Sequence, residues 1–311
     1  MGIAVAVHNL TKHYGDITAV DNISFEVNHG EIFGFLGPNG AGKTTTIRIL
    51  TGIIKPDEGK ATIMGHDIEK EPLQAKQIMG IVPEMSNAYV DLSAWDNLML
   101  IGELYGVSKK QRIERAKRLL EKFGLYERRN QLVRGFSKGM KQRLILCMAL
   151  INEPPILFLD EPTSGLDVES AKLIREMITE LNNTGTTVFL TTHNMEEANK
   201  LCHRIAIINH GRIAAIDTPE NLRMKSSSLQ SIEVSFDHLM NTNDLAKIPC
   251  VKQVEKMGDK IKLYTSDPSE TLNCIMDYAR SHKIRIIALN TLAPSLEEVF
   301  LKLTQKNVRD D

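Results

Sequence analysis

The sequence has no sizeable excess of charge of either sign. Its 311 residues include 38 Lys and Arg against 39 Asp and Glu, which gives a formal net charge of −1. Such a chain has no overall cationic field to attract nucleic acid and no acidic excess that would indicate disorder. The part from Ser226 onward is balanced too, with 11 basic and 12 acidic residues. We therefore expect a globular protein that does not bind nucleic acid.

Cysteine pairs and long apolar runs are also missing. The four cysteines, at positions 147, 202, 250 and 274, contain no C-x-x-C pair, so reduced, cytosolic thiols are expected. The start, MGIAVAVHNLTK, lacks the cationic segment and apolar core of a signal peptide. The longest apolar runs, such as LILCMALI at 144–151, are far shorter than the ~20 residues that cross a bilayer. We expect no direct membrane insertion, so any membrane role requires a partner.

The chain does contain an alternation of strand and helix patterns up to about residue 221. Three nearly continuous apolar runs are typical of buried parallel strands: EIFGFLG at 31–37, PILFLDE at 155–161 and TTVFLTTH at 186–193. NISFEV at 22–27 alternates apolar and polar residues, as in a strand with one solvated side. Residues 93–129 show only helical spacing and indicate an inserted helical subdomain. The predicted fold class of this part is α/β, with an antiparallel β subdomain beside the inserted helical one.

The length and the hydrophobic fraction of 42% allow about two domains. LRMKSSSLQ, at 222–230, loses all periodicity and supplies three serines. We therefore predict a core domain at 1–221, a linker at 222–229 and a small accessory domain at 230–311.

The accessory domain carries its own strand and helix signals. SIEVSFD alternates, MGDK at 257–260 fits a hairpin turn, and Asp267 and Pro268 fit the cap and first position of a helix. A further strand is predicted at 284–290, and a last helix begins at Ser295 with a capping box to Glu298. This order predicts a small α+β domain.

A glycine-rich loop, GPNGAGKTT, follows a predicted strand and precedes a helix pattern. It satisfies G-x-x-x-x-G-K-[ST], in which the backbone N–H groups and the helix N-terminus surround phosphate oxygens. Lys43 is expected to reach the β- and γ-phosphates, and Thr44 to ligate Mg²⁺. An ordinary glycine-rich turn is the alternative, which the matched strand and helix disfavour. The expected nucleotide-binding residues are Gly37, Pro38, Asn39, Gly40, Ala41, Gly42, Lys43, Thr44 and Thr45.

Two carboxylates end the apolar run ILFLDE at 156–161. Ligands of open α/β sheets bind at the carboxyl ends of the strands. We expect Asp160 to hold Mg²⁺ and Glu161 to polarise the attacking water. Acidic residues also follow strands as simple helix caps, so the assignment of this pair to catalysis depends on the presence of the phosphate loop.

With further motifs in the same order, residues 4–221 resemble the nucleotide-binding subunit of an ATP-binding cassette (ABC) transporter. The resemblance implies that Tyr14, in KHYG, stacks on adenine and that Asp167, which ends SGLD at 164–167, contacts the opposite subunit. It also implies that His193, which ends FLTTH, senses the γ-phosphate. Without the resemblance, Tyr14 fits a strand-edge tyrosine and His193 a structural histidine.

FSKGM, at 136–140, takes the place of the family's signature loop, which is commonly LSGGQ. The resemblance implies that this loop lies far from its own phosphate loop and completes the site of the other subunit, with two ATP molecules in a head-to-tail homodimer. Ser137 would cap its helix and offer its hydroxyl to the γ-phosphate, while Gly139 lets the backbone approach. Lys138 adds charge to the phosphate or points to solvent. In a chain that never dimerises, the segment is only a capped helix.

Glu84, in IVPE, stands where the family usually has glutamine. A carboxylate can accept a bond from metal-bound water but cannot donate one, so the resemblance assigns Glu84 to the metal and to hydrolysis with its exact part open. Within the family, the chain is similar to the branch that serves drug-resistance and sodium-efflux exporters. The similarity depends on this variant, on the segment SKGMKQRL and on PSLEEVF near the end of the sequence. That branch carries a small C-terminal domain.

The resemblance implies an ATPase that dimerises on MgATP and drives a separate integral membrane permease. It would act at the cytoplasmic face of the cell membrane, in export of a drug, an ion or another small substrate. The loop around Glu84 and the helical insert would form the permease-docking surface. A non-transport cassette protein acting on ribosomes or nucleic acid is an alternative, but the paired cassettes or coiled-coil insertions of such proteins are missing. A P-loop kinase that transfers phosphate to a small molecule is a further alternative, but it gives no reason for SGLD and FSKGM at these positions.

Overall fold

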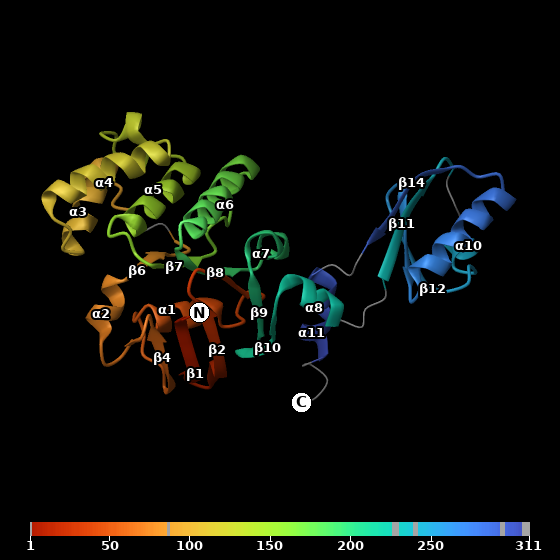
Figure 1. Cartoon of the computed structure of the whole chain (residues 1–311), viewed down its shortest axis with the longest axis horizontal. Helices are drawn as coiled ribbons and strands as arrows, with labels where there is room; N and C mark the ends of the chain where they lie inside the picture. The colour runs from red at the N-terminus through yellow and green to blue at the C-terminus, as the bar shows by residue number, and fades with distance from the viewer. Residues whose placement is uncertain (1, 86–87, 226–229, 239–241, 293–295, 307–311) are drawn as a thin grey trace. The chain divides into compact units, whose positions relative to one another are not determined.

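The chain divides into two compact units, Met1–Pro219 and Glu220–Asp311 (Figure 1). The computed structural model describes residues 2–85, 88–225, 230–238, 242–292 and 296–306. Residues 222–225 of the predicted linker belong to helix α8 (Pro219–Lys225), and residues 226–229 lie outside the described residues. The predicted domain boundaries therefore stay a prediction.

Two sheets build the first unit and confirm the predicted α/β core with an antiparallel subdomain. The larger sheet has the order β10-β9-β3-β8-β7-β6, in which β3, β8, β7 and β6 pair in parallel. Its strands are β3 (Ile32–Leu36), β6 (Met79–Val82), β7 (Ile156–Asp160), β8 (Thr187–Thr192), β9 (Arg204–Asn209) and β10 (Arg212–Asp217). The antiparallel sheet has the order β2-β1-β4-β5 and comprises β1 (Ile3–Tyr14), β2 (Ile17–Asn28), β4 (Glu58–Ile63) and β5 (His66–Asp67).

Aromatic packing holds the two sheets together. Phe25 of β2 packs on Phe33 and Phe35 of β3, with ring centroids 5.5 Å apart in both pairs. Helix α1 (Lys43–Leu50) adds Ile47 and Ile49 to the same buried cluster. Since burial of such side chains is the main stabilising contribution to a core, α1 and the loop before it are held firmly between the sheets.

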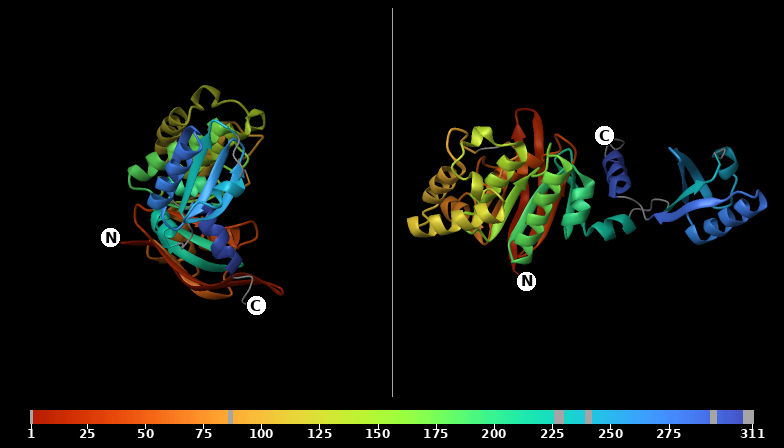
Figure 2. Two further views of the ribbon diagram at one scale, coloured as in Figure 1. Left: turned by 90° about the vertical axis from the view of Figure 1, so that its right-hand side faces the viewer. Right: turned by 90° about the horizontal axis from the view of Figure 1, so that it is seen from above.

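The predicted helical insert is confirmed as α3 (Ala94–Leu104) and α4 (Lys109–Lys122), followed by α5 (Lys138–Leu150). Ser93 and Ser108 begin the first two helices by accepting the backbone N–H groups of Asp96 and Gln111. These helices gather at one end of the first unit (Figures 1 and 2). Its other helices are α2 (Pro72–Gln77), α6 (Val168–Asn183) and α7 (Met195–Leu201). In the described parts of the chain, no helix is both long and apolar enough to cross a membrane.

The second unit is the predicted small α+β domain. Its sheet has the order β12-β13-β11-β14, with strands β11 (Gln230–Phe236), β12 (Val251–Met257), β13 (Lys260–Thr265) and β14 (Ile286–Leu292). Helix α10 (Pro268–Ser281) packs on this sheet and buries Ile275 (Figure 1). The unit also contains residues 220–225 of α8, α9 (Thr242–Leu245) and α11 (Leu296–Lys306).

Local signals in the second unit behave as predicted, with one shift. Gly258 has a φ of +65° in the hairpin between β12 and β13, and Asp267 caps α10 by accepting the N–H of Glu270. The predicted strand at 284–290 begins only at Ile286, because the N–H of Ile284 donates to Ala279 at the end of α10. Ser295, the predicted cap of the last helix, lies outside the described residues.

Candidate nucleotide site

The strand order brings four distant segments to one edge of the larger sheet. β3, β8, β7 and β6 are neighbours and run parallel, so their carboxyl ends lie side by side. The residues that follow them are the phosphate loop after β3, His193 after β8, Glu161 after β7 and Glu84 after β6. An edge of this kind is where open α/β sheets bind ligands.

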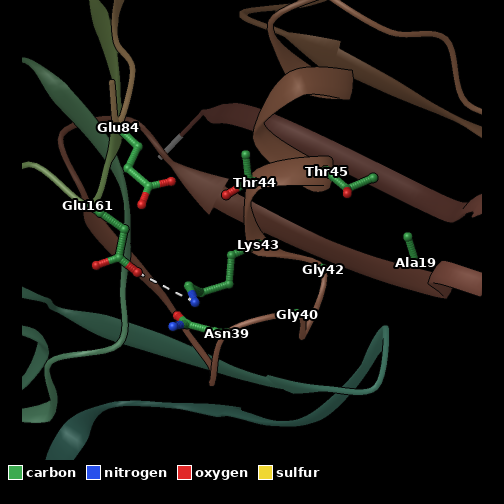
Figure 3. Close-up of a pocket in the computed structure, with 9 residues that line it drawn as sticks. All are labelled: Ala19, Asn39, Gly40, Gly42, Lys43, Thr44, Thr45, Glu84 and Glu161. Atoms are coloured by element: carbon green, nitrogen blue, oxygen red, sulfur yellow. Dashed lines mark ion pairs between the residues drawn. The ribbon is translucent and has the colours of Figure 1, made fainter. Parts of the chain in front are cut away.

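The phosphate loop runs from Gly37 into α1 and depends on glycine backbone geometry. Gly42 has a φ of +106°, and a Cβ there would lie 2.3 Å from the carbonyl oxygen of Ala19. The buried Lys43 donates from its Nζ to the carbonyl oxygens of Gly37 at 2.8 Å and Pro38 at 3.0 Å. The loop therefore holds the ammonium group against its own backbone, on the side that faces Glu161 (Figure 3).

A cavity of about 280 Å³ lies over this loop (Figure 3). It is lined by Ala19, Asn39, Gly40, Gly42, Lys43, Thr44, Thr45, Glu84 and Glu161. Predicted residues that follow three different strands therefore line the same cavity. Gly37 and Pro38 bind Lys43 through their carbonyl oxygens, and Ala41 is buried. Sequence reasoning missed Ala19 of β2, because alanine has no polar group that would signal a site.

Glu161 connects the phosphate loop to His193. Its Oε1 lies 3.4 Å from Lys43 Nζ, and its Oε2 lies 2.8 Å from His193 Nδ1. Only 8% of the residue is exposed, and Oε1 has no hydrogen-bond partner among the described residues. The backbone of Glu161 has a φ of +50°, a left-handed conformation that non-glycine residues adopt at a cost. Its N–H donates to the carbonyl and hydroxyl oxygens of Thr191, which hold this turn.

Asp160 is buried beside Glu161 and accepts a hydrogen bond from the hydroxyl of Thr191. Burial raises the pKa of Asp160, the Thr191 bond opposes this, and the charges of Glu84 and Glu161 raise the pKa further. The nearby Thr44 hydroxyl also lowers the pKa of Asp160. A cation here would relieve the repulsion. Sequence reasoning missed Thr191, although a threonine pair at a strand end just before His193 was a usable signal.

Asp160 and its neighbours do not form a complete metal site by themselves. Within the described ranges, no three His, Cys, Asp or Glu side chains are arranged to hold an ion. The donor set does fit a hard cation that takes further oxygen ligands, because Thr44 offers a hydroxyl and Asp160 a carboxylate on facing segments.

The FSKGM segment lies against the SGLD segment of the same chain. Ser137 caps α5, as predicted, and accepts the N–H of Met140 at 3.3 Å. A Cβ on Gly165 would lie 2.2 Å from Lys138 Nζ, so this exposed lysine lies over the glycine backbone. None of the residues of FSKGM lines the cavity over the phosphate loop.

Asp167 begins α6 in the same neighbourhood. It accepts hydrogen bonds from the backbone N–H and the hydroxyl of Ser170, both at 2.8 Å, and these bonds lower the pKa of Asp167. A Cβ on Gly139 would lie 2.5 Å from the same Ser170 hydroxyl. Ser170 therefore joins the two segments that the resemblance directs at the opposite subunit.

Tyr14 lies at the end of β1 and is 47% exposed. Lys12 Nζ lies 5.8 Å from its ring centroid. Tyr14 is not among the residues that line the cavity, whereas Ala19 on the adjoining strand is. Its stacking on adenine stays a prediction.

Comparison with known proteins identifies this arrangement. A family model described as "ABC transporter" matches residues 20–164, which include the phosphate loop, Asp160 and Glu161. The chain is 39% identical over 307 residues to the linearmycin resistance ATP-binding protein LnrL of Bacillus subtilis (strain 168), which covers 97% of this chain and 98% of the relative. The chain belongs to the ABC transporter family. It is an ATP-binding subunit of this family, an ATPase whose hydrolysis of ATP drives transport.

Other relatives indicate which branch of the ABC family the chain belongs to. A model described as "ATP-binding protein DrrA1-3-like, C-terminal domain" matches residues 218–304. The chain is 38% identical to the Nod factor export ATP-binding protein I of Cupriavidus metallidurans, over 100% of both chains. It is 34% identical to the daunorubicin/doxorubicin resistance ATP-binding protein DrrA of Streptomyces peucetius, over 97% of this chain and 92% of the relative. The predicted exporter branch of the ABC family is thereby confirmed.

Solved ABC subunits share the fold of the first unit. The structure of an ATP-binding subunit of an ABC transporter superposes with a TM-score of 0.66 at 31% identity and covers 71% of this chain and 92% of its own. A dimeric cassette in a post-hydrolysis state with ADP and Pi gives a TM-score of 0.63 at 28% identity, over 69% of this chain and 98% of its own.

Proposed function

We propose that this ABC subunit hydrolyses MgATP with Glu161 as the base that activates water, and that two copies bind head to tail and share two nucleotide sites. The observation that carries the proposal is the position of Glu161, whose buried Oε1 faces Lys43 across the phosphate cavity without a hydrogen-bond partner in the described structure. A carboxylate oxygen placed there can accept a proton from a water molecule that attacks the γ-phosphate. Phosphate release by the intact protein and by Glu161→Gln tests this assignment.

The chain's own residues divide the work at each site. Lys43 binds the β- and γ-phosphates, Glu161 polarises the water, and His193, held by Glu161, contacts the γ-phosphate. Thr44, Asp160 and Glu84 would hold Mg²⁺, which would neutralise phosphate charge. Tyr14 stacks on adenine and thereby fixes the base.

The second half of each site comes from the partner copy. Ser137, Lys138, Gly139 and Asp167 lie together and lie apart from the cavity of their own chain, which supports their use in trans. The hydroxyl of Ser137 and the backbone at Gly139 would contact the γ-phosphate, with Lys138 and Asp167 beside them. The dimeric cassette to which this chain is similar supports the same assembly.

A second cavity offers a place for the permease. It has about 340 Å³ and is lined by Thr51, Ile53, Lys76, Ile81, Leu104 and Tyr105. Ile53 and Leu104 are 63% and 70% exposed, a large apolar exposure for one groove. Ile81 lies on β6, three residues before Glu84 of the nucleotide cavity, so one short segment connects the two cavities. We assign the groove to an amphipathic cytoplasmic segment of the permease, with an acidic residue placed toward Lys76.

The permease would hold the ATPase at the cytoplasmic face of the cell membrane. The relatives named for linearmycin resistance, Nod factor export and daunorubicin resistance support export of a drug, an ion or another small substrate. The permease selects that substrate.

Leu104→Glu tests the docking groove. An unpaired polar group in an apolar contact costs about 1–3 kcal/mol and an ionised carboxylate costs more, so we expect the fraction of the protein in washed membranes of its own host to fall by at least roughly tenfold. ATP hydrolysis by the purified subunit should stay within about twofold, because Leu104 does not line the nucleotide cavity. Ile287→Glu is the matched control, since Ile287 is 66% exposed on β14, in the second unit. Equal membrane binding by both variants would contradict the assignment.

A chain truncated after Lys225 tests the division of labour between the units. All residues that line the nucleotide cavity precede Thr192, and α8 ends at Lys225, so the cut leaves site and helix whole. We expect the Kd for a fluorescent ATP analogue to stay within about threefold of that of the full chain, because no cavity contact is removed. Loss of nucleotide binding by a truncated protein with native circular dichroism would show that residues 226–311 take part in the site.

A further inference from the structure

One buried carboxylate near the site has no part in the chemistry described so far. Glu197 lies in the first turn of α7, is only 2% exposed and does not line the nucleotide cavity. Its Oε1 accepts a hydrogen bond from the hydroxyl of Thr163 at 2.7 Å. Burial raises the pKa of Glu197, and the hydroxyls of Thr163 and Thr192 oppose this. Helix capping is satisfied by an exposed glutamate, so capping does not account for burying an acid here.

The Thr163 end of this bond belongs to the turn that leads into SGLD. Thr163 is the second residue after Glu161, and its carbonyl oxygen accepts the N–H of Leu166 at 3.2 Å. The N–H of Ser164 donates to the carbonyl oxygen of Glu161 at 3.0 Å. Two hydrogen-bonded turns therefore span residues 161–166, directly before Asp167, and the Thr163 side chain leaves them toward α7.

The Glu197 end fixes the turn that carries His193. The N–H of Glu197 donates to Asn194 Oδ1 at 3.0 Å, and the N–H of Asn194 donates to Thr192 Oγ1 at 2.9 Å. His193 lies between those two residues, and its Nδ1 lies 2.8 Å from Glu161 Oε2. A displacement of Glu197 would therefore change the distance between His193 and Glu161.

We propose that the hydrogen bond between Thr163 and Glu197 couples the loop 164–167 to the Glu161–His193 pair of the same chain. The inference rests on the proposed function, in which Asp167 of this loop faces the nucleotide site of the partner copy. Contact between Asp167 and an occupied partner site shifts the loop, Thr163 transmits the shift to Glu197, and α7 sets His193 against Glu161. Thr163 and Glu197 are positioning residues, since neither lines the nucleotide cavity.

The test is a double-mutant cycle in the full-length protein. Thr163→Val removes the hydroxyl and keeps the shape, and Asp167→Ala removes the carboxylate of the loop. We expect each single variant to lower kcat for ATP by about tenfold with KM within about twofold, since coupling acts on the reacting geometry rather than on ATP binding. The double variant should be no more than about twofold slower than the slower single variant, because both substitutions cut one connection.

Two variants of Glu197 and one control variant separate coupling from simple stability. Glu197→Gln keeps an oxygen that accepts the Thr163 hydroxyl, so its kcat should stay within about threefold, whereas Glu197→Ala should match Thr163→Val. Thr179→Val is the matched control, because it removes a hydroxyl that donates to the carbonyl oxygen of Arg175 at 3.1 Å on the exposed surface of α6. It should leave kcat unchanged.

Two results overturn the inference, and they differ in what else they overturn. If Asp167→Ala is slow and its effect multiplies with that of Thr163→Val, the coupling through Glu197 fails while the proposed dimer stands. If Asp167→Ala keeps full activity, the role of the loop 164–167 at the partner site fails, and the inference fails with it.

Discussion

Glu161→Gln is expected to lower the turnover of ATP by roughly 10²- to 10⁴-fold, the usual contribution of a positioned general base. The amide keeps the shape of the side chain but is a much weaker base. ATP binding should survive, because Lys43 keeps its bonds to the carbonyl oxygens of Gly37 and Pro38. Phosphate release at saturating MgATP measures the loss.

The same variant should accumulate as a dimer. ATP holds the two copies together and is no longer hydrolysed, so gel filtration with MgATP should show twice the subunit mass. Glu121→Gln is the matched control: Glu121 is half exposed on α4, where it pairs with Lys117 outside the site. Wild-type turnover, or a variant that stays monomeric at saturating ATP, would refute the assignment of Glu161.

Lys43→Ala and Gly139→Asp are each expected to abolish ATPase activity, yet a mixture of the two inactive proteins should recover it in part. The first variant loses the charge at the phosphates, and the second directs a carboxylate at the γ-phosphate of the partner. In a head-to-tail dimer, one site of the heterodimer collects both defects and the other is whole. Random pairing makes half of the dimers heterodimers, so about a quarter of all sites are intact.

The structure refines this experiment. Gly139→Asp also displaces the Ser170 hydroxyl, which donates a hydrogen bond to Asp167. Ser170 and Asp167 both lie on the surface assigned to the partner site, so this displacement affects the same site as the new carboxylate, and the expected fraction of intact sites is unchanged. A mixture of Lys43→Ala with the double variant Lys43→Ala, Gly139→Asp is the control, since it contains no intact site. In a Glu161→Gln background, the heterodimer of the first mixture should retain about one ATP. Retention of none would exclude the shared site.

The placement of the phosphate loop and of the acidic strand end was largely readable from sequence because it is local. A strand, a glycine-rich loop and a helix follow one another, so Lys43 and Thr44 are placed by backbone geometry within a few residues. The carboxylates Asp160 and Glu161 end a single apolar strand, and Ser137 caps the helix that begins next to it. Such contacts span short distances along the chain, where spacing alone determines which groups meet.

Contacts between distant segments were not readable in the same way. Thr191 holds Asp160 and Glu161 from another strand, Ala19 enters the cavity from the other sheet, and Thr163 bonds Glu197 across 34 residues. None of these residues belongs to a spaced motif that points to its partner. Their pairing depends on strand register and on how helices pack, which a linear pattern does not encode.

By itself, the sequence determined the fold class, the phosphate loop, the acidic strand end and the family. Each of these depends on short continuous motifs, and such motifs determine the local backbone conformation. Only the tertiary structure decided that β3, β8, β7 and β6 are neighbours, which sets Lys43, His193, Glu161 and Glu84 around one edge. It also decided that FSKGM packs on SGLD and apart from the cavity of its own chain. The physical reason is that side-chain burial and parallel hydrogen bonding select one strand order among many that the same local patterns allow.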